Sequence, residues 1–128
     1  MPSQKRKFGD IGEAIAEDWI KRNKYTIIEK NYWKPWGEID IVSKKSNKII
    51  FFEVKTRELF HVKHFLPEQS VNTSKMKKLK KVCVTYLLDK RYSPEQEWQI
   101  DILSILINKE TLESKIEHIE NAVWEERY

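Results

Sequence analysis

The sequence contains little cysteine, glycine or proline. Its 128 residues include one cysteine, three glycines and four prolines. The lone thiol of Cys83 excludes an internal disulfide and a zinc site built from several cysteines. No apolar run approaches the roughly 18 residues that a membrane span needs, and the first residues lack the apolar stretch of a secretory signal. We therefore expect a soluble, cytoplasmic protein that does not use a membrane.

The overall amino-acid composition predicts one folded domain. Hydrophobic residues make up 40% of the chain and charged residues 34%, a balance that excludes a disordered protein. A chain of this length buries enough surface for a conventional core without disulfides or structural metal. We expect a single domain over residues 1–128.

Positive charge is concentrated in the middle of the chain. The formal net charge is +4, but residues 70–91 hold seven Lys and Arg against one Asp, a local charge of +6. Residues 108–128 hold three basic residues against six acidic ones, a local charge of −3. Clustered lysines at a pI near 9.1 are typical of nucleic-acid binding, although a solvated helix face has the same pattern.

Hydrophobic periodicity predicts an α/β fold in the order α-β-β-β-α-β-β. The expected elements are a helix over 9–24, strands over 25–33, 38–43 and 49–57, a helix from 70 or 73 to 89, a strand over 98–107 and an edge strand over 115–122. The helix between the third and fourth strands is a crossover, which predicts that these two strands are parallel.

Two acids and a lysine converge if the second and third strands form a hairpin. Side chains alternate along a strand, so Glu38 and Asp40 share one face of the second strand, and Glu53 and Lys55 share one face of the third. A turn at 46–47 sets Asp40 opposite Glu53 and Glu38 opposite Lys55. A shifted turn staggers this pairing or sets Asp40 opposite Lys55, within the same patch.

This patch matches the needs of phosphodiester hydrolysis. Mg²⁺ is held by one or two carboxylates, for which Asp40 and Glu53 are candidates, and a flexible lysine such as Lys55 can orient a water or steady developing charge. The alternative interpretation is a solvated strand face with cross-strand Glu–Lys pairs. The residues alone leave both interpretations open.

Several short motifs follow one another along nearly the whole chain. They are Gly9-x-x-Gly12-Glu13-x-x-Ala16, Gly37-Glu38-Ile39-Asp40, Glu53-Val54-Lys55-Thr56-Arg57, Val71 and Lys75 ahead of a helix, and His118-Ile119-x-Asn121-Ala122. In this order they resemble the YraN family, a bacterial group similar to Holliday-junction resolvases within the restriction-endonuclease-like PD-(D/E)XK superfamily.

The resemblance implies a restriction-endonuclease-like core, a mixed β-sheet flanked by helices. It also implies that Asp40 and Glu53 bind Mg²⁺ or Mn²⁺, that Lys55 is the motif lysine, and that Glu13 is the helical acid that joins the metal site. Spacing alone places Glu13 only at the border of its helix's apolar arc. Ile39 stands where the proline that gives the superfamily its name would be.

The remaining basic residues are candidates for nucleic-acid contacts. On a helical projection Lys75 falls within the apolar stripe and points inward, either toward a scissile phosphate or out again along its flexible stem. The outer lysines and one arginine are expected to contact phosphates: Lys77, Lys78, Lys80, Lys81 and Arg57.

Aromatic and imidazole side chains occur in two predicted connections. Trp33 and Trp36 flank a turn, where they either cap the hairpin core or stack on an unpaired base. His61 and His64 lie in a loop without a third metal ligand and are expected at the surface.

Together these features predict a metal-dependent endonuclease that acts on DNA, with branched DNA and a homodimer implied by the resolvase-like relatives. Two alternatives remain: a domain of this fold that binds nucleic acid without cutting it, and a protein-interaction domain whose acidic tail engages a basic partner.

Overall fold

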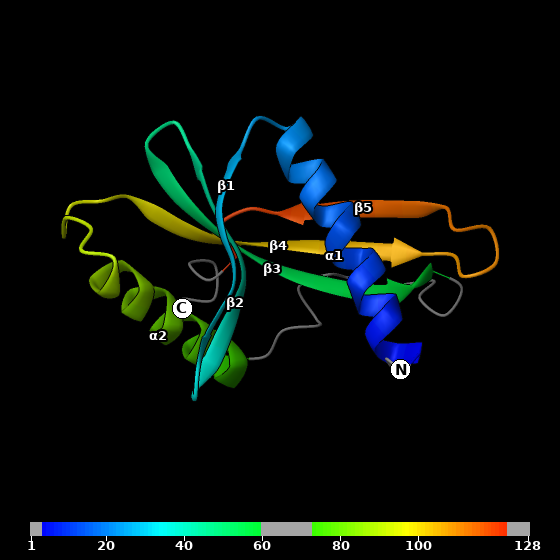
Figure 1. Ribbon diagram of the computed structural model, residues 1–128, viewed down its shortest axis with the longest axis horizontal. Helices are drawn as coiled ribbons and strands as arrows, with labels where there is room; N and C mark the ends of the chain where they lie inside the picture. The colour runs from blue at the N-terminus through cyan, green and yellow to red at the C-terminus, as the bar shows by residue number, and fades with distance from the viewer. Residues whose placement is uncertain (1–3, 60–72, 123–128) are drawn as a thin grey trace.

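Two helices and one five-stranded sheet make up the computed structural model, which describes residues 4–59 and 73–122 (Figure 1). The elements are α1 (Gln4–Arg22), β1 (Thr26–Lys34), β2 (Gly37–Lys45), β3 (Lys48–Glu58), α2 (Thr73–Asp89), β4 (Trp98–Ile107) and β5 (Ser114–Ile119). This order and the mixed sheet confirm the predicted α/β, restriction-endonuclease-like core.

The strands lie in the sheet in the order of the chain, β1-β2-β3-β4-β5. β1, β2 and β3 are antiparallel neighbours, β3 and β4 are parallel, and β5 returns antiparallel to β4. The parallel pair lies on either side of α2 in the chain, which confirms the predicted crossover.

A two-residue turn at Ser46 and Asn47 joins β2 to β3. Both residues have positive φ, 49° and 64°. Consecutive left-handed residues form the type I′ turn, whose twist matches that of the flanking strands. The turn sets Ile41 opposite Phe52, which is the register expected from a turn at this position.

The helices cover opposite faces of the sheet, so the molecule has three layers (Figure 1). Ala16 and Ile20 of α1 pack in one core cluster with Phe52 of β3. Val82 and Cys83 of α2 pack in a second cluster on the other face, where the thiol is fully buried as small core filler.

Two element boundaries differ from the prediction by three residues or more. α1 begins at Gln4 rather than near Gly9, because an additional turn brings Phe8 against the core. β5 ends at Ile119 rather than at residue 122, because Asn121 has a φ of 52° and the Ala122 N–H donates to the Ile100 carbonyl.

Some predictions concern residues that the structure does not describe. His61, His64, Val71 and most of the predicted loop lie outside the described ranges. Within those ranges, neither helix combines the length and apolarity needed to cross a bilayer.

Candidate active site

The acids of β2 and β3 meet where the two strands separate. The paired residues of this hairpin end at Ile41 and Phe52. One residue further, the carboxylate of Asp40 takes the place of a strand partner, because the Val54 N–H donates to its Oδ2 at 2.8 Å. The divergence therefore turns the Asp40 carboxyl toward β3, next to Glu53.

Two ammonium groups surround the Glu53 carboxylate, which is only 8% exposed. The Nζ of Lys55 lies 3.3 Å from its Oε2, and the Nζ of Lys75 lies 3.5 Å from the same oxygen. Lys55 comes from the same strand and Lys75 from the first turn of α2. The Lys75 side chain remains 46% exposed, and its ammonium group reaches an acid of the sheet.

The surroundings of the Asp40 carboxyl disfavour its charged form. Burial raises its pKa to about 8, and the negative charge of Glu53 and a hydrogen bond with Glu53 add to the effect. The hydrogen bond from Val54 acts in the opposite direction. Two carboxyls this close repel when both are ionised, and a bound cation would remove that repulsion.

Burial also lowers the pKa of the Lys55 ammonium, and the charge of Lys75 acts in the same direction. Glu53 opposes the shift. The lysine that faces the acids is thus brought closer to neutrality than a lysine in water, which favours a role in proton handling.

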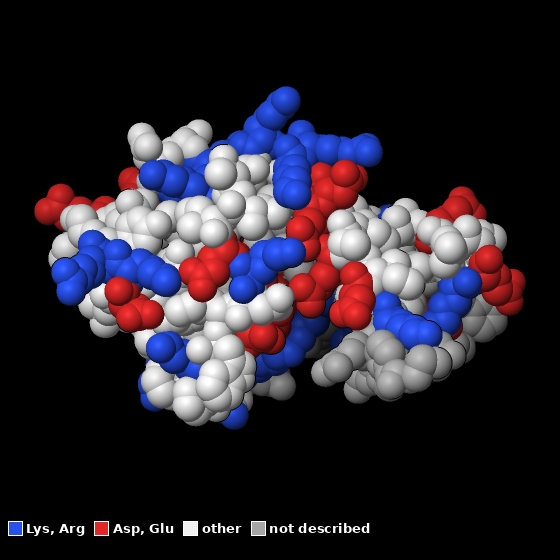
Figure 2. Space-filling view, in the orientation of Figure 1, with Lys and Arg blue, Asp and Glu red and all other residues white. Residues whose placement is uncertain are grey.

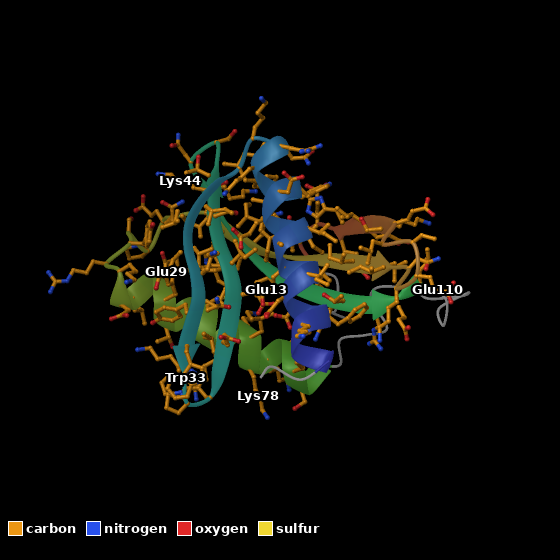
Figure 3. All side chains as sticks on the ribbon, turned by 45° about the vertical axis from the view of Figure 1, so that its right-hand side comes forward. Glu13, Glu29, Trp33, Lys44, Lys78 and Glu110 are labelled. Atoms are coloured by element: carbon orange, nitrogen blue, oxygen red, sulfur yellow. The ribbon has the colours of Figure 1, made fainter. Side chains whose placement is uncertain are left out.

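α1 adds a third acid through a close contact with β3. A Cβ on Gly12 would lie 2.8 Å from Cγ2 of Thr56, so the helix backbone lies directly on the strand. This contact places the next residue, Glu13, on the side of α1 that faces the hairpin (Figure 3). Burial raises the pKa of Glu13, with the charge of Glu38 next, and Glu13 in turn raises the pKa of Asp40.

The surface near these residues has an acidic centre with basic side chains on either side. Figure 2 shows red side chains gathered in the middle of one face, between α1 and the β1–β2 hairpin of Figure 1, with blue side chains to either side. An acidic centre bordered by cations suits a metal ion and a polyanion at the same place.

The model of Uncharacterised protein family UPF0102 matches residues 12–105. This chain belongs to the UPF0102 family. The finding confirms the resemblance to the YraN family and covers Glu13, Asp40, Glu53, Lys55 and Lys75.

Curated UPF0102 proteins align with this chain over nearly its full length. One from Thermodesulfovibrio yellowstonii is 41% identical over 116 residues, which are 91% of this chain and 95% of the relative. One from Caldanaerobacter subterraneus is 35% identical over 92% of this chain and 95% of its own. One from Clostridium beijerinckii is 34% identical over 95% of this chain and 97% of the relative.

The outer lysines of this UPF0102 protein lie where the helical projection placed them. Lys77, Lys78 and Lys81 are exposed, and Lys80 is partly buried. Three of them line an open hollow of about 410 Å³ together with Val84 and Thr85: Lys77, Lys80 and Lys81. Arg57 is exposed near the end of β3, two residues beyond Lys55.

Sequence analysis missed a second polar cluster in this UPF0102 fold. Asp101 of β4 is fully buried, and its carboxylate oxygens lie 2.7 Å from Nε2 of His118, 2.9 Å from the Asn121 N–H and 2.8 Å from Nε2 of Gln99. Glu120 completes a group with the residue types of a metal site. Because three partners already occupy the Asp101 oxygens, the cluster fastens the end of β5 to β4.

A signal for this cluster is present in the sequence. Asp101 is the one charged residue of the mainly apolar strand β4, and a buried acid requires partners. His118 and Asn121, both in the closing motif, supply them.

Proposed function

We propose that this protein is a divalent-metal-dependent endonuclease that hydrolyses DNA phosphodiesters, with branched DNA as the substrate class implied by the resolvase-like relatives. The observation that supports it is the meeting of Asp40, Glu53 and Lys55 in a partly buried position where β2 and β3 diverge. A solvated strand face, the alternative interpretation, does not explain why Glu53 is only 8% exposed.

The donor set fits a hard cation. Asp40 and Glu53 offer carboxylate oxygens from adjacent strands, and Glu13 offers a third from α1, which is the ligand chemistry that Mg²⁺ and Mn²⁺ select. When bound, such an ion neutralises the phosphate and lowers the pKa of an attacking water.

The chain's own cations have separate tasks in this proposal. Lys55, next to Glu53 and with a lowered pKa, orients the attacking water and accepts or returns its proton. Lys75 approaches the same carboxylate from α2 and reaches the phosphate that enters beside it. Arg57 and the outer lysines hold the phosphates that flank the cleaved bond.

The test is cleavage of linear, flapped and four-way DNA by purified protein with Mg²⁺ or Mn²⁺. Asp40→Asn, Glu53→Gln and Lys55→Met are each expected to reduce cleavage at least about 100-fold, because each removes a charge or a ligand at the reacting phosphate. The matched control is Asp18→Asn, an exposed acid of α1 paired with Arg22, which should cut like the wild type.

Removal of the metal with a chelator should abolish cleavage, and added Mn²⁺ should restore it. Equal cutting by wild type and all three site variants would assign the activity to a contaminant and reject the proposal.

A specific observation also favours the non-catalytic alternative. The lysine-lined hollow on α2 lies outside the acid cluster and could bind a phosphate backbone without any metal. The salt-dependence experiment in the Discussion separates this alternative from the nuclease.

A further inference from the structure

Two tryptophans at the tip of the β1–β2 hairpin face solvent. Trp33 is 66% exposed and Trp36 is 41% exposed. They stand three residues apart at the hairpin tip, on either side of Lys34 and Pro35. Trp33 lies opposite Glu38 in the strand pair, whereas Trp36 lies against α2. Both rings keep a large part of their surface open to solvent.

The hairpin tip is fixed beside the basic face of α2. A Cβ on Gly37 would lie 2.7 Å from Cγ2 of Val82, so the hairpin backbone packs tightly on the helix. The Nζ of Lys81 lies 5.4 Å from the centre of the Trp36 ring. Figure 3 shows Trp33 at the hairpin tip and Lys78 on α2 at the same end of the molecule.

Lys81 belongs to both surfaces. It contacts the Trp36 ring and also lines the 410 Å³ hollow with Lys77 and Lys80. A ligand that spans this end of the molecule therefore meets aromatic faces next to ammonium groups. Bases stack on aromatic rings and phosphates bind ammonium groups, so the combination fits a nucleic-acid strand.

We propose that Trp33 and Trp36 form a base-stacking site for unpaired nucleotides. Bases inside a duplex are stacked on each other and cannot present a free face to an indole, whereas a single-stranded end, flap or junction can. Stacking contributes about 1–3 kcal/mol per base without regard to sequence, so the ligand class is nucleic acid with unpaired bases of any sequence.

The site lies close to the acids along the same segment of chain. Trp36 precedes Asp40 by four residues, which is about 13 Å at the rise of a β-strand. This step rests on the proposed nuclease function: an unpaired segment bound at the hairpin tip sets the distance at which the strand reaches Asp40. The stacking site itself does not depend on cleavage.

The test is binding of labelled oligo(dT) and of a blunt duplex of the same length, without metal, to wild type and to a Trp33→Ala, Trp36→Ala double variant. The double variant is expected to lose about 10- to 100-fold in affinity for oligo(dT) and to keep its affinity for the duplex. Quenching of tryptophan fluorescence by oligo(dT) in the wild type should weaken in the same variant.

Leu112→Ala is the matched control, because Leu112 is also 66% exposed but lies far from the hairpin in the sequence. It should bind both ligands like the wild type. A Trp33→Phe, Trp36→Phe variant should keep part of the oligo(dT) affinity. Equal oligo(dT) affinity for the double alanine variant and the wild type, or an equal loss on the duplex, would overturn the proposal.

The readouts keep this proposal separate from the nuclease. Binding is measured in Asp40→Asn as well as in the wild type, so the absence of cleavage leaves the stacking result unaffected. If the wild type cleaves DNA and the double alanine variant binds oligo(dT) as tightly as the wild type, the stacking site is rejected and the nuclease proposal stands.

Discussion

The Asp40 carboxyl links the stability of the protein to pH. Its ordinary pKa is 3.8 and burial in the fold raises the pKa to about 8. Between these values the folded chain keeps a proton that the unfolded chain has lost. The stabilisation is therefore full below about pH 4, decreases as the pH rises, and is gone above about pH 8.

Replacement of Asp40 by Asn should remove this dependence. The amide oxygen can still accept the Val54 N–H, but no charge forms at high pH. Near pH 9 we expect the free energy of unfolding of the metal-free variant to exceed that of the wild type by about 1–3 kcal/mol, or roughly 4–10 °C in Tm. Near pH 5 the difference should be much smaller. Thermal melts with chelator at both pH values measure this, and an equal difference at the two would contradict it.

Single residues differ in how far the sequence reveals their environment. Asp40 and Glu53 could be placed together because a two-residue turn fixes their register, and Lys75 because helical geometry fixes its direction. Asp101 and His118 were not placed together, because their contact depends on the register of β5 against β4. The six residues between these two strands specify that register less tightly than a two-residue turn does.

At the scale of elements, the position of α1 depends on a glycine. Gly12→Ala would bring a methyl group into the Thr56 side chain, and the helix would have to move away from β3. We expect a loss of about 1–3 kcal/mol in the free energy of unfolding, and reduced cleavage because Glu13 moves with the helix.

Gly9→Ala is the control within the same helix. A Cβ there meets no atom within 4 Å, so the change should stabilise α1 by about 0.5–1 kcal/mol through helix propensity alone. Denaturant unfolding compares the two variants. If the free energy of unfolding changed in the same direction in both variants, helix propensity rather than the contact with Thr56 would explain both changes.

The types and order of the elements were predictable because their periodicity is strong, whereas two of their ends differ from the prediction by three residues or more. α1 extends past its first glycine to bury Phe8, and β5 stops early at a left-handed Asn121. In both cases a contact with another part of the chain decides where the element ends.

At the scale of the whole molecule, charge separates into an acidic centre, seen in Figure 2, and a group of lysines on α2. Lys77→Glu with Lys80→Glu should lower DNA affinity at least about 10-fold and reduce the slope of log affinity against log salt by roughly 2, since each phosphate contact contributes about 0.9. Lys21→Glu with Lys24→Glu makes the same charge change at the end of α1 and should have a much smaller effect.

This experiment also separates the three functions, with binding measured by fluorescence anisotropy without metal. Lysine-dependent binding without metal-dependent cutting identifies the non-catalytic domain. No binding of any nucleic acid at low salt would reject both nucleic-acid functions and leave the protein-interaction domain.

The Ser46–Asn47 turn has a consequence for how the site is assembled. Asp40 and Glu53 are thirteen positions apart in the chain, and one short hairpin brings them together. Glu13 and Lys75 reach this acid pair only through the packing of α1 and α2 on the sheet. A change that loosens either helix would therefore alter the charges around the pair without separating the two acids.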